Sequence, residues 1–299
     1  MTPATAGVPV AGAALRSLLD GLVDWAGLFP PAALPMRDAV RLYDEYRRGP
    51  RAWAFGRFVL PAARLAEFEE HAAALPVAGA RWRLSVLAGP ADRAAIDAFN
   101  VRQGARAEID AIEGKASTIA EIEALAPFAA AFTTYVEIPT ATDPEPLIVA
   151  IHAHGLRAKV RTGGVTAEAF PAAAQVVRFL AACAAHDVAF KATAGLHHPL
   201  PGDYQLTYET GGPSAAMFGF VNVFIAACLL REGAGEAAAT ELLAERDATA
   251  IAFDADGVRW RDHRVPAVRL GELRRRFATS FGSCSFAEPL DELAALGLL

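Results

Sequence analysis

The chain has 299 residues, of which 54% are hydrophobic and 21% charged, so it can bury a substantial core and is too apolar for extended disorder. A net charge of −6, with no tract rich in Lys and Arg, argues against nucleic acid as a partner. The longest apolar run, residues 217–230, is too short to cross a bilayer and contains Asn222, so no membrane partner is expected either.

Cysteine usage points to a reducing compartment. Cys183, Cys228 and Cys284 lie far apart without CxxC spacing, and an odd count argues against a disulfide framework in a chain of this size. We therefore expect a cytoplasmic protein.

Residues 217–230 are expected to form a helix that is buried against the rest of the chain or at a subunit contact of a homo-oligomer.

Strand-like apolar segments alternate with helical segments along most of the chain, after an opening helix at 13–21. The predicted strands are 23–31, 55–61, 82–90, 107–114, 133–139, 156–164, 188–195 and 280–286. The predicted helices after them are 36–48, 65–75, 92–103, 119–131, 145–154, 167–185 and 290–298. Such alternation predicts parallel pairing, because each crossover needs a helix that covers the sheet. We expect a (β/α)8 TIM barrel, with an open doubly wound sheet as the alternative.

The connection between the seventh and eighth strands is unusually long. Residues 197–277 are expected to carry two or three helices and a surface hairpin, as an insertion in a single domain of residues 1–299. The segment 250–253 is also strand-like, but the turn residues Asp254 to Gly257 that follow it favour a hairpin over a barrel strand.

In a TIM barrel the active site lies at the C-terminal ends of the strands, so the polar residues at those positions are the candidates. They are Asp24, Asp110, Glu113, Lys115, Glu137, Lys159, Arg161, Thr162, Lys191, Thr193, His197, His198, Ser283, Cys284 and Ser285.

Lysine is the most informative residue type among them. Only Lys115, Lys159 and Lys191 occur among 28 basic residues, and a lysine, unlike an arginine, can lose its proton and attack a carbonyl. On successive strands, Lys159 and Lys191 are expected to face one cavity, where repulsion would lower the pKa of at least one of them. The alternative is that each lysine forms a structural ion pair with Glu137, Asp110 or Glu113.

Two strand ends carry a family resemblance. The segment AKVRTGG, which holds Lys159, Thr162 and Gly163, resembles the K-x-x-T-G strand of the deoxyribose-phosphate aldolase family of class I aldolases. The segment FKATAG, with Lys191 and Gly195, resembles the next strand of that family. The resemblance implies that Lys159 forms a Schiff base and that Lys191 perturbs its pKa.

The resemblance extends weakly to two acidic residues and then stops. The segment AEID, ending at Asp110, is similar to a family strand whose aspartate relays protons, and Asp24 could match an aspartate of the first strand. After Gly195, however, the residues Leu196 to Pro199 replace the glycine-rich turn that helps the family bind phosphate. The pair Gly163-Gly164 could still offer backbone N–H groups to an anion, or serve only the turn.

The leading hypothesis is an aldolase-like lyase that needs no cofactor. Lys159 would form an imine with a small aldehyde or ketone, while Asp110, Glu137 or a water held by them moves protons. The substrate oxygens would be bound by Arg161, Thr162, Thr193 and His197. Other residues assigned to the substrate site are Gly163, Gly164, Gly195, His198 and Glu113.

Two other classes of function remain open. Glu113 and Glu137, with His197 or His198, could hold a divalent metal in an isomerase or hydrolase, although at least one histidine is expected to be a hydrogen-bonded loop residue. The barrel could also be a binding module without catalysis. Cys284 is either a thiol at the barrel mouth or a small apolar filler.

Overall fold

The computed structural model describes residues 10–77 and 79–299, and eight of its strands close into a parallel barrel. These strands are β1 (Val23–Trp25), β2 (Phe55–Pro61), β3 (Trp82–Leu87), β4 (Ala107–Lys115), β5 (Thr133–Glu137), β6 (Arg157–Arg161), β7 (Phe190–Thr193) and β13 (Ala278–Ser283). β1 pairs in parallel with both β2 and β13, which closes the ring. The predicted (β/α)8 barrel is confirmed, and the open sheet is wrong.

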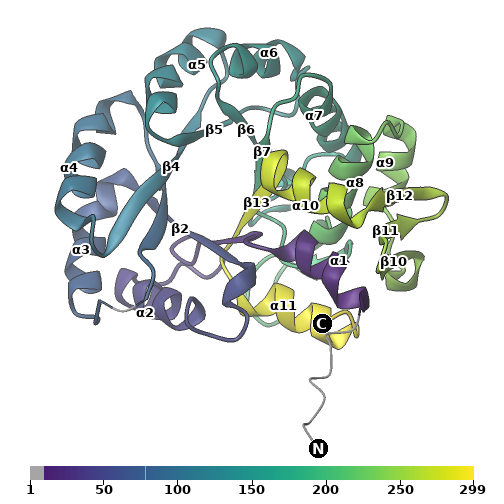
Figure 1. Cartoon of the computed structure of the whole chain (residues 1–299), viewed down its shortest axis with the longest axis horizontal. Coiled ribbons are helices and arrows are strands. Elements are labelled where there is room, and N and C mark those ends of the chain that lie inside the picture. Colours follow the sequence, from purple (N-terminus) through teal and green to yellow (C-terminus); the bar gives the residue numbers. More distant parts are fainter. Residues whose placement is uncertain (1–9, 78) are drawn as a thin grey trace, which may run out of the picture.

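A ring of helices covers the barrel (Figure 1). The helices up to β7 are α1 (Val10–Leu19), α2 (Met36–Tyr46), α3 (Leu65–Ala73), α4 (Arg93–Gln103), α5 (Ile119–Leu125), α6 (Glu145–Ala153) and α7 (Ala173–Ala185), and α11 (Ala287–Ala295) follows β13. Each turns an apolar stripe inward, as in α2, where Met36, Val40 and Tyr43 are buried at helical spacing.

The connection from β7 to β13 is enlarged as predicted. It contains the hairpin β8 (Gly202–Gln205) and β9 (Ser214–Met217), the helices α8 (Phe220–Arg231), α9 (Glu236–Leu243) and α10 (Ala267–Arg276), and the sheet of β10 (Ile251–Asp254), β11 (Gly257–Trp260) and β12 (His263–Pro266). β10 and β11 form the expected hairpin. The third strand β12 and the β8–β9 hairpin were not predicted, because strands of four residues carry little periodicity.

Helix α8 is buried almost throughout, in agreement with its uniformly apolar sequence. The ring of Phe220 stacks on Phe281 of β13, with 5.1 Å between the ring centroids. The amide of Asn222 donates hydrogen bonds to the carbonyl oxygens of Leu242 and Glu245. Asn222 therefore caps the end of α9.

One further segment, Ala167–Ala185, has the length and apolar composition of a membrane span. Here it folds as a short 3-10 turn, Ala167–Ala169, followed by α7. Val176, Phe179 and Leu180 of α7 belong to the hydrophobic core. One face of α7 therefore packs in the core of the barrel.

Gly56 at the start of β2 makes room for the carboxylate of Asp24 on β1. A Cβ atom at position 56 would overlap Asp24 Oδ1, the oxygen that accepts a hydrogen bond from the backbone N–H of Arg57 at 2.7 Å. The close approach of β1 and β2 thus fixes the orientation of this buried acid.

We expect Gly56→Ala to lower the free energy of unfolding by about 1–3 kcal/mol, because the added methyl group must displace Asp24 or the strand. Gly89→Ala is the control, since a Cβ there meets nothing within 4 Å, and it should change stability by less than about 0.5 kcal/mol. Urea titration of both variants provides the measurement. Equal stability of the two variants would contradict the role given to Gly56.

Candidate active site

Three charged residues lie side by side on neighbouring barrel strands. Glu137 on β5 is in register with Lys159 on β6, which is in register with Lys191 on β7. Residues in register on neighbouring parallel strands point to the same face of the sheet. The strand register therefore brings the two lysines and a glutamate to one level of the barrel interior.

Two more carboxylates complete a continuous series of opposite charges. Lys191 Nζ donates hydrogen bonds to Asp24 Oδ2 at 2.7 Å and to Glu113 Oε1 at 2.6 Å. Lys159 Nζ lies 2.7 Å from Glu113 Oε2 and 2.9 Å from Glu137 Oε2. The order Asp24–Lys191–Glu113–Lys159–Glu137 alternates in sign, and each lysine lies between two carboxylates.

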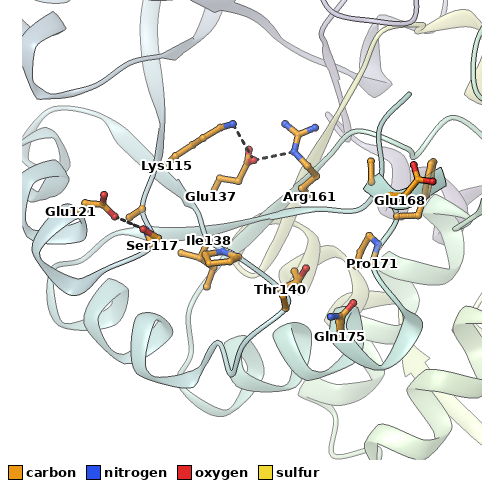
Figure 2. Close-up of a pocket in the computed structure, with 15 residues that line it drawn as sticks. Lys115, Ser117, Glu121, Glu137, Ile138, Thr140, Arg161, Glu168, Pro171 and Gln175 are labelled. Carbon is orange, nitrogen blue, oxygen red and sulfur yellow. Dashed lines mark hydrogen bonds and ion pairs between the residues drawn. The ribbon is translucent and has the colours of Figure 1, made fainter. Parts of the chain in front are cut away.

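The series reaches the barrel mouth through Glu137. Its Oε1 atom lies 3.1 Å from Arg161 Nε and 3.6 Å from Lys115 Nζ, and Figure 2 shows both cations directed at this carboxylate. All three lysines of the chain thus contact Glu113 or Glu137. Their side-chain exposures differ greatly, at 67% for Lys115, 4% for Lys159 and 1% for Lys191.

The electrostatics correct one expectation from the sequence. Burial by itself would lower the pKa of Lys191, but Asp24 and Glu113 outweigh that effect and raise its pKa above the usual range. Burial would likewise raise the pKa of Glu113, yet the two lysines hold it well below its ordinary value. Repulsion between the lysines therefore does not discharge Lys191, because the Glu113 carboxylate lies between them and Lys191 is held as an ammonium ion.

Neighbouring side chains fix the orientation of these carboxylates. Ser280 Oγ donates a hydrogen bond to Asp24 Oδ2 at 2.8 Å, and Ser85 Oγ donates one to Glu113 Oε1 at 2.6 Å. Both serines are buried on barrel strands, and the sequence analysis did not assign them to the site. The available signal was a hydroxyl residue inside a predicted buried strand, where it must find a polar partner.

A cavity of about 270 Å³ opens above the lysines at the C-terminal ends of the strands. Its polar or conformationally special lining residues are Glu113, Lys159, Arg161, Gly164, Lys191, Thr193, Gly195, His197 and Cys284. Phe29, Pro31 and Val165 add apolar walls. The structure therefore brings most of the predicted site residues together around one pocket of a size suited to a small molecule.

Some predicted residues have other partners. Asp110 is engaged by Arg57 Nε and by Arg83 Nη2, each at 2.6 Å, so its carboxylate is paired with arginines and not with the lysines. Thr162 Oγ1 donates to the carbonyl oxygens of Thr193 and Ala194, which ties the end of β6 to the end of β7.

Gly163 and Gly195 allow those same two strand ends to approach closely. A Cβ on either would crowd the Cα of the other and the ring of Phe170. Gly195 also has a φ of +74°, a conformation that favours glycine. Both glycines therefore have a structural reason to be present, whether or not their backbone N–H groups also meet a ligand.

The two histidines face different partners. His197 Nδ1 lies 3.5 Å from Glu288 Oε2 and 3.9 Å from Cys284 Sγ, at the edge of the cavity. His198 Nδ1 lies 2.7 Å from Glu292 Oε1, and its ring stacks on Tyr204. His198 is thus the hydrogen-bonded loop histidine.

The expected metal set of Glu113, Glu137 and a histidine is not assembled, because lysines occupy both glutamates. Among the described residues, the donor atoms that come within 4.8 Å of one another belong to His198, Glu288 and Glu292. These two glutamates also contact histidines directly. This group was not predicted, because His198 is about 90 residues from Glu288 and Glu292 in the chain and meets them only in the folded structure.

Comparisons of the chain with protein-family models, with curated proteins and with solved structures return no match. The geometry of the pocket is therefore the basis for assigning a function.

Replacement of Lys191 by methionine should destabilise the protein by about 3–5 kcal/mol near pH 7, because two buried carboxylates would lose their common cation. The lysines contribute stability through Glu113 above its ordinary pKa of 4.5, and that contribution fades as the pH falls below 4.5. The difference between Lys191→Met and the wild type should therefore shrink in acid.

Urea titrations near pH 7 and near pH 4 measure this effect. Lys115→Met is the matched control, since the exposed Lys115 should contribute no more than about 1 kcal/mol. A Lys191→Met protein as stable as Lys115→Met near pH 7 would contradict the pairing scheme.

A second prediction concerns His197. Burial lowers the pKa of this imidazole, but its hydrogen bonds with Cys284 and Glu288 outweigh burial and raise the pKa to about 9. Stabilisation by this pair should be complete below about pH 6.5 and disappear as the pH rises through about 9. Glu288→Gln should lower the pKa of His197. Glu292 pairs with His198 instead, so Glu292→Gln should leave the pKa of His197 unchanged.

Histidine ring NMR across this pH range gives the midpoints, with the His197 resonance assigned from a His197→Gln variant. A midpoint for His197 that is the same in the wild type and in Glu288→Gln would show that Glu288 does not hold its proton.

Proposed function

We propose that the protein is an aldolase-like lyase in which Lys159 forms a Schiff base with a small aldehyde or ketone, in line with its resemblance to the deoxyribose-phosphate aldolase family. The observation that carries this proposal is the setting of Lys159. Its side chain lines the cavity at the C-terminal ends of the strands, and its amino group lies 2.9 Å from Glu137 Oε2. That oxygen is buried, and no described residue other than Lys159 pairs with it.

Glu137 is the group that can receive the proton of Lys159. Its Oε2 atom is near the amine, and no described residue other than Lys159 pairs with it. Burial would raise the pKa of Glu137, but Lys159 and Arg161 outweigh burial and hold that pKa below its ordinary value. The proton therefore passes to Glu137 only as the amine attacks the carbonyl carbon of a bound carbonyl compound. Loss of water, with the proton returned from Glu137 to the departing oxygen, gives the protonated imine.

Cleavage of the carbon–carbon bond follows from the protonated imine. The Glu137 carboxylate, directly or through a water, removes the proton of the substrate hydroxyl group and later returns it to the enamine carbon. The bond between the α and β carbons breaks, and its electron pair moves into the iminium group to give an enamine. The hydroxyl carbon leaves as an aldehyde. Protonation of the enamine carbon and hydrolysis of the imine then release the second product and free Lys159.

Within this scheme Lys191 is a positioning residue. Its hydrogen bonds to Asp24 and Glu113 hold Lys191 as a fixed positive charge. Lys191 thereby fixes the orientation of the Glu113 carboxylate, whose other oxygen contacts Lys159. Asp110 has no part in the reaction as we draw it, because Arg57 and Arg83 hold its carboxylate. This replaces the proton-relay role suggested by the family resemblance.

We further propose that the protein is cytoplasmic, acts on a small carbonyl compound, and binds neither nucleic acid nor membrane. A macromolecular partner, if there is one, would be a second copy of this chain. Support for a reducing compartment comes from Cys183, Cys228 and Cys284, which are all free.

The test is reductive trapping on the full chain. With cyanoborohydride and a panel of small aldehydes and ketones, exposed amines such as Lys115 react with any aldehyde, so the diagnostic result is a covalent adduct on the buried Lys159, identified by peptide mass mapping. The chain has only three lysines, so the assignment is unambiguous. Lys159→Arg retains a positive charge but cannot form an imine under these conditions, and it should give no adduct at this position.

The outcome also separates the other classes of function. Absence of an adduct on Lys159 with every carbonyl compound would refute the proposal. A non-catalytic binding module predicts that Lys159→Arg changes only stability. A metal-dependent enzyme predicts activity that follows the metal content of the protein.

A further inference from the structure

Arg161 at the barrel mouth has an unusual hydrogen-bonding state for an arginine beside a buried glutamate. Its Nε atom donates to Glu137 Oε1 at 3.1 Å, but no described residue bonds either of its terminal nitrogens. Figure 2 shows these two nitrogens on the side of the guanidinium away from Glu137. The side chain is 45% exposed, so two N–H groups of the planar fork remain available to a ligand.

The charges around the cavity are not balanced. One network of ion pairs contains four cations, each of which contacts Glu113 or Glu137. They are Lys115, Lys159, Lys191 and Arg161. That network contains only the three carboxylates Asp24, Glu113 and Glu137. The excess of one positive charge lies at the open end, where Lys115 and Arg161 share the single oxygen Glu137 Oε1. An anionic group of a ligand would restore neutrality there.

Among the described residues, Glu137 is the acidic residue that pairs with Arg161, and those further out form no hydrogen bond or ion pair with it. Glu121 and Glu168 line the wider basin outside β5 and β6. Glu121 is turned onto Ser117 and Thr118, whose backbone N–H groups it accepts at 2.6 and 3.0 Å. Figure 2 shows Glu121 and Glu168 at opposite sides of this basin, with Glu137 and Arg161 between them.

Strand geometry relates Arg161 to the nucleophile. Arg161 follows Lys159 by two positions on β6, so both side chains point into the barrel and their Cα atoms are about 7 Å apart. Both line the same cavity, and they contact the two different oxygens of the Glu137 carboxylate. A substrate carbonyl at Lys159 therefore places a group a few bonds away within reach of the Arg161 fork.

We propose that Arg161 binds an anionic group of the substrate, so that the substrates are small carbonyl compounds that carry a carboxylate or a phosphate within a few bonds of the reacting carbon. This inference rests on the proposed function. An arginine fork matches both oxyanions in a bidentate manner, which a point charge such as Lys115 cannot do. Arg161 would then select substrates, while Lys159 performs the chemistry.

The test compares matched carbonyl pairs in the trapping reaction. Pyruvate is compared with acetone for a carboxylate, and glyceraldehyde 3-phosphate with glyceraldehyde for a phosphate. For wild-type protein, the anionic member of at least one pair should reach half-maximal labelling of Lys159 at a concentration about 10- to 100-fold lower than its neutral partner. Whichever pair shows the difference identifies the anion.

Arg161→Gln should reduce that ratio to near one, and Arg161→Lys should leave an intermediate ratio because it keeps the charge and loses the fork. Arg37→Gln is the control, since Arg37 on α2 is 78% exposed and pairs only loosely with Asp38 at 3.6 Å. It removes the same charge from the chain and should leave the ratio as in the wild type.

Two results would overturn the inference while the proposed function stands. One is equal labelling by neutral and anionic partners in the wild type. The other is an unchanged ratio in Arg161→Gln. If no compound labels Lys159, the proposed function fails, and titration calorimetry with inorganic phosphate and with acetate still tests the anion site. Binding that Arg161→Gln abolishes would support the site, and absence of binding to the wild type would refute it.

Discussion

The carboxylate of Glu113 is the contact on which the site depends. One of its oxygens accepts a hydrogen bond from Lys191, and the other contacts Lys159. Two buried ammonium groups on neighbouring strands would otherwise repel each other strongly in a medium of low polarity. Because Glu113 comes from β4, on the other side of β5 from the lysine strands β6 and β7, this pairing also couples distant parts of the barrel wall.

The fold could be predicted from the sequence because its signal is repeated eight times. Each buried parallel strand is a short apolar run, and each is followed by a segment long enough for a crossover. The predicted C-terminal ends of several strands lie beyond the observed ends. The first strand was predicted at 23–31, but β1 ends at Trp25 and the residues after it form a turn. The apolar character of that segment comes from residues that line the cavity, such as Phe29 and Pro31.

The site was predicted in its membership more than in its electrostatics. The structure brings Lys159, Lys191 and Glu137, which were selected from predicted strand ends, to one level of the barrel interior. The pairing of Glu113 with both lysines depends on barrel closure, which no local pattern encodes. Asp110 was assigned to the site from a four-residue motif. In the structure its carboxylate instead pairs with Arg57 and Arg83, which are far from it in sequence.

The distribution of the three lysines, one exposed at the barrel mouth and two buried inside the barrel, has a practical consequence for chemical labelling. Arginine supplies all the other basic residues counted with lysine, so side-chain primary amines are found only at Lys115, Lys159 and Lys191. An amine-reactive dye or cross-linker applied to the intact protein has Lys115 as its one exposed side-chain target. The label would therefore report directly on the entrance of the barrel, without any engineered attachment point.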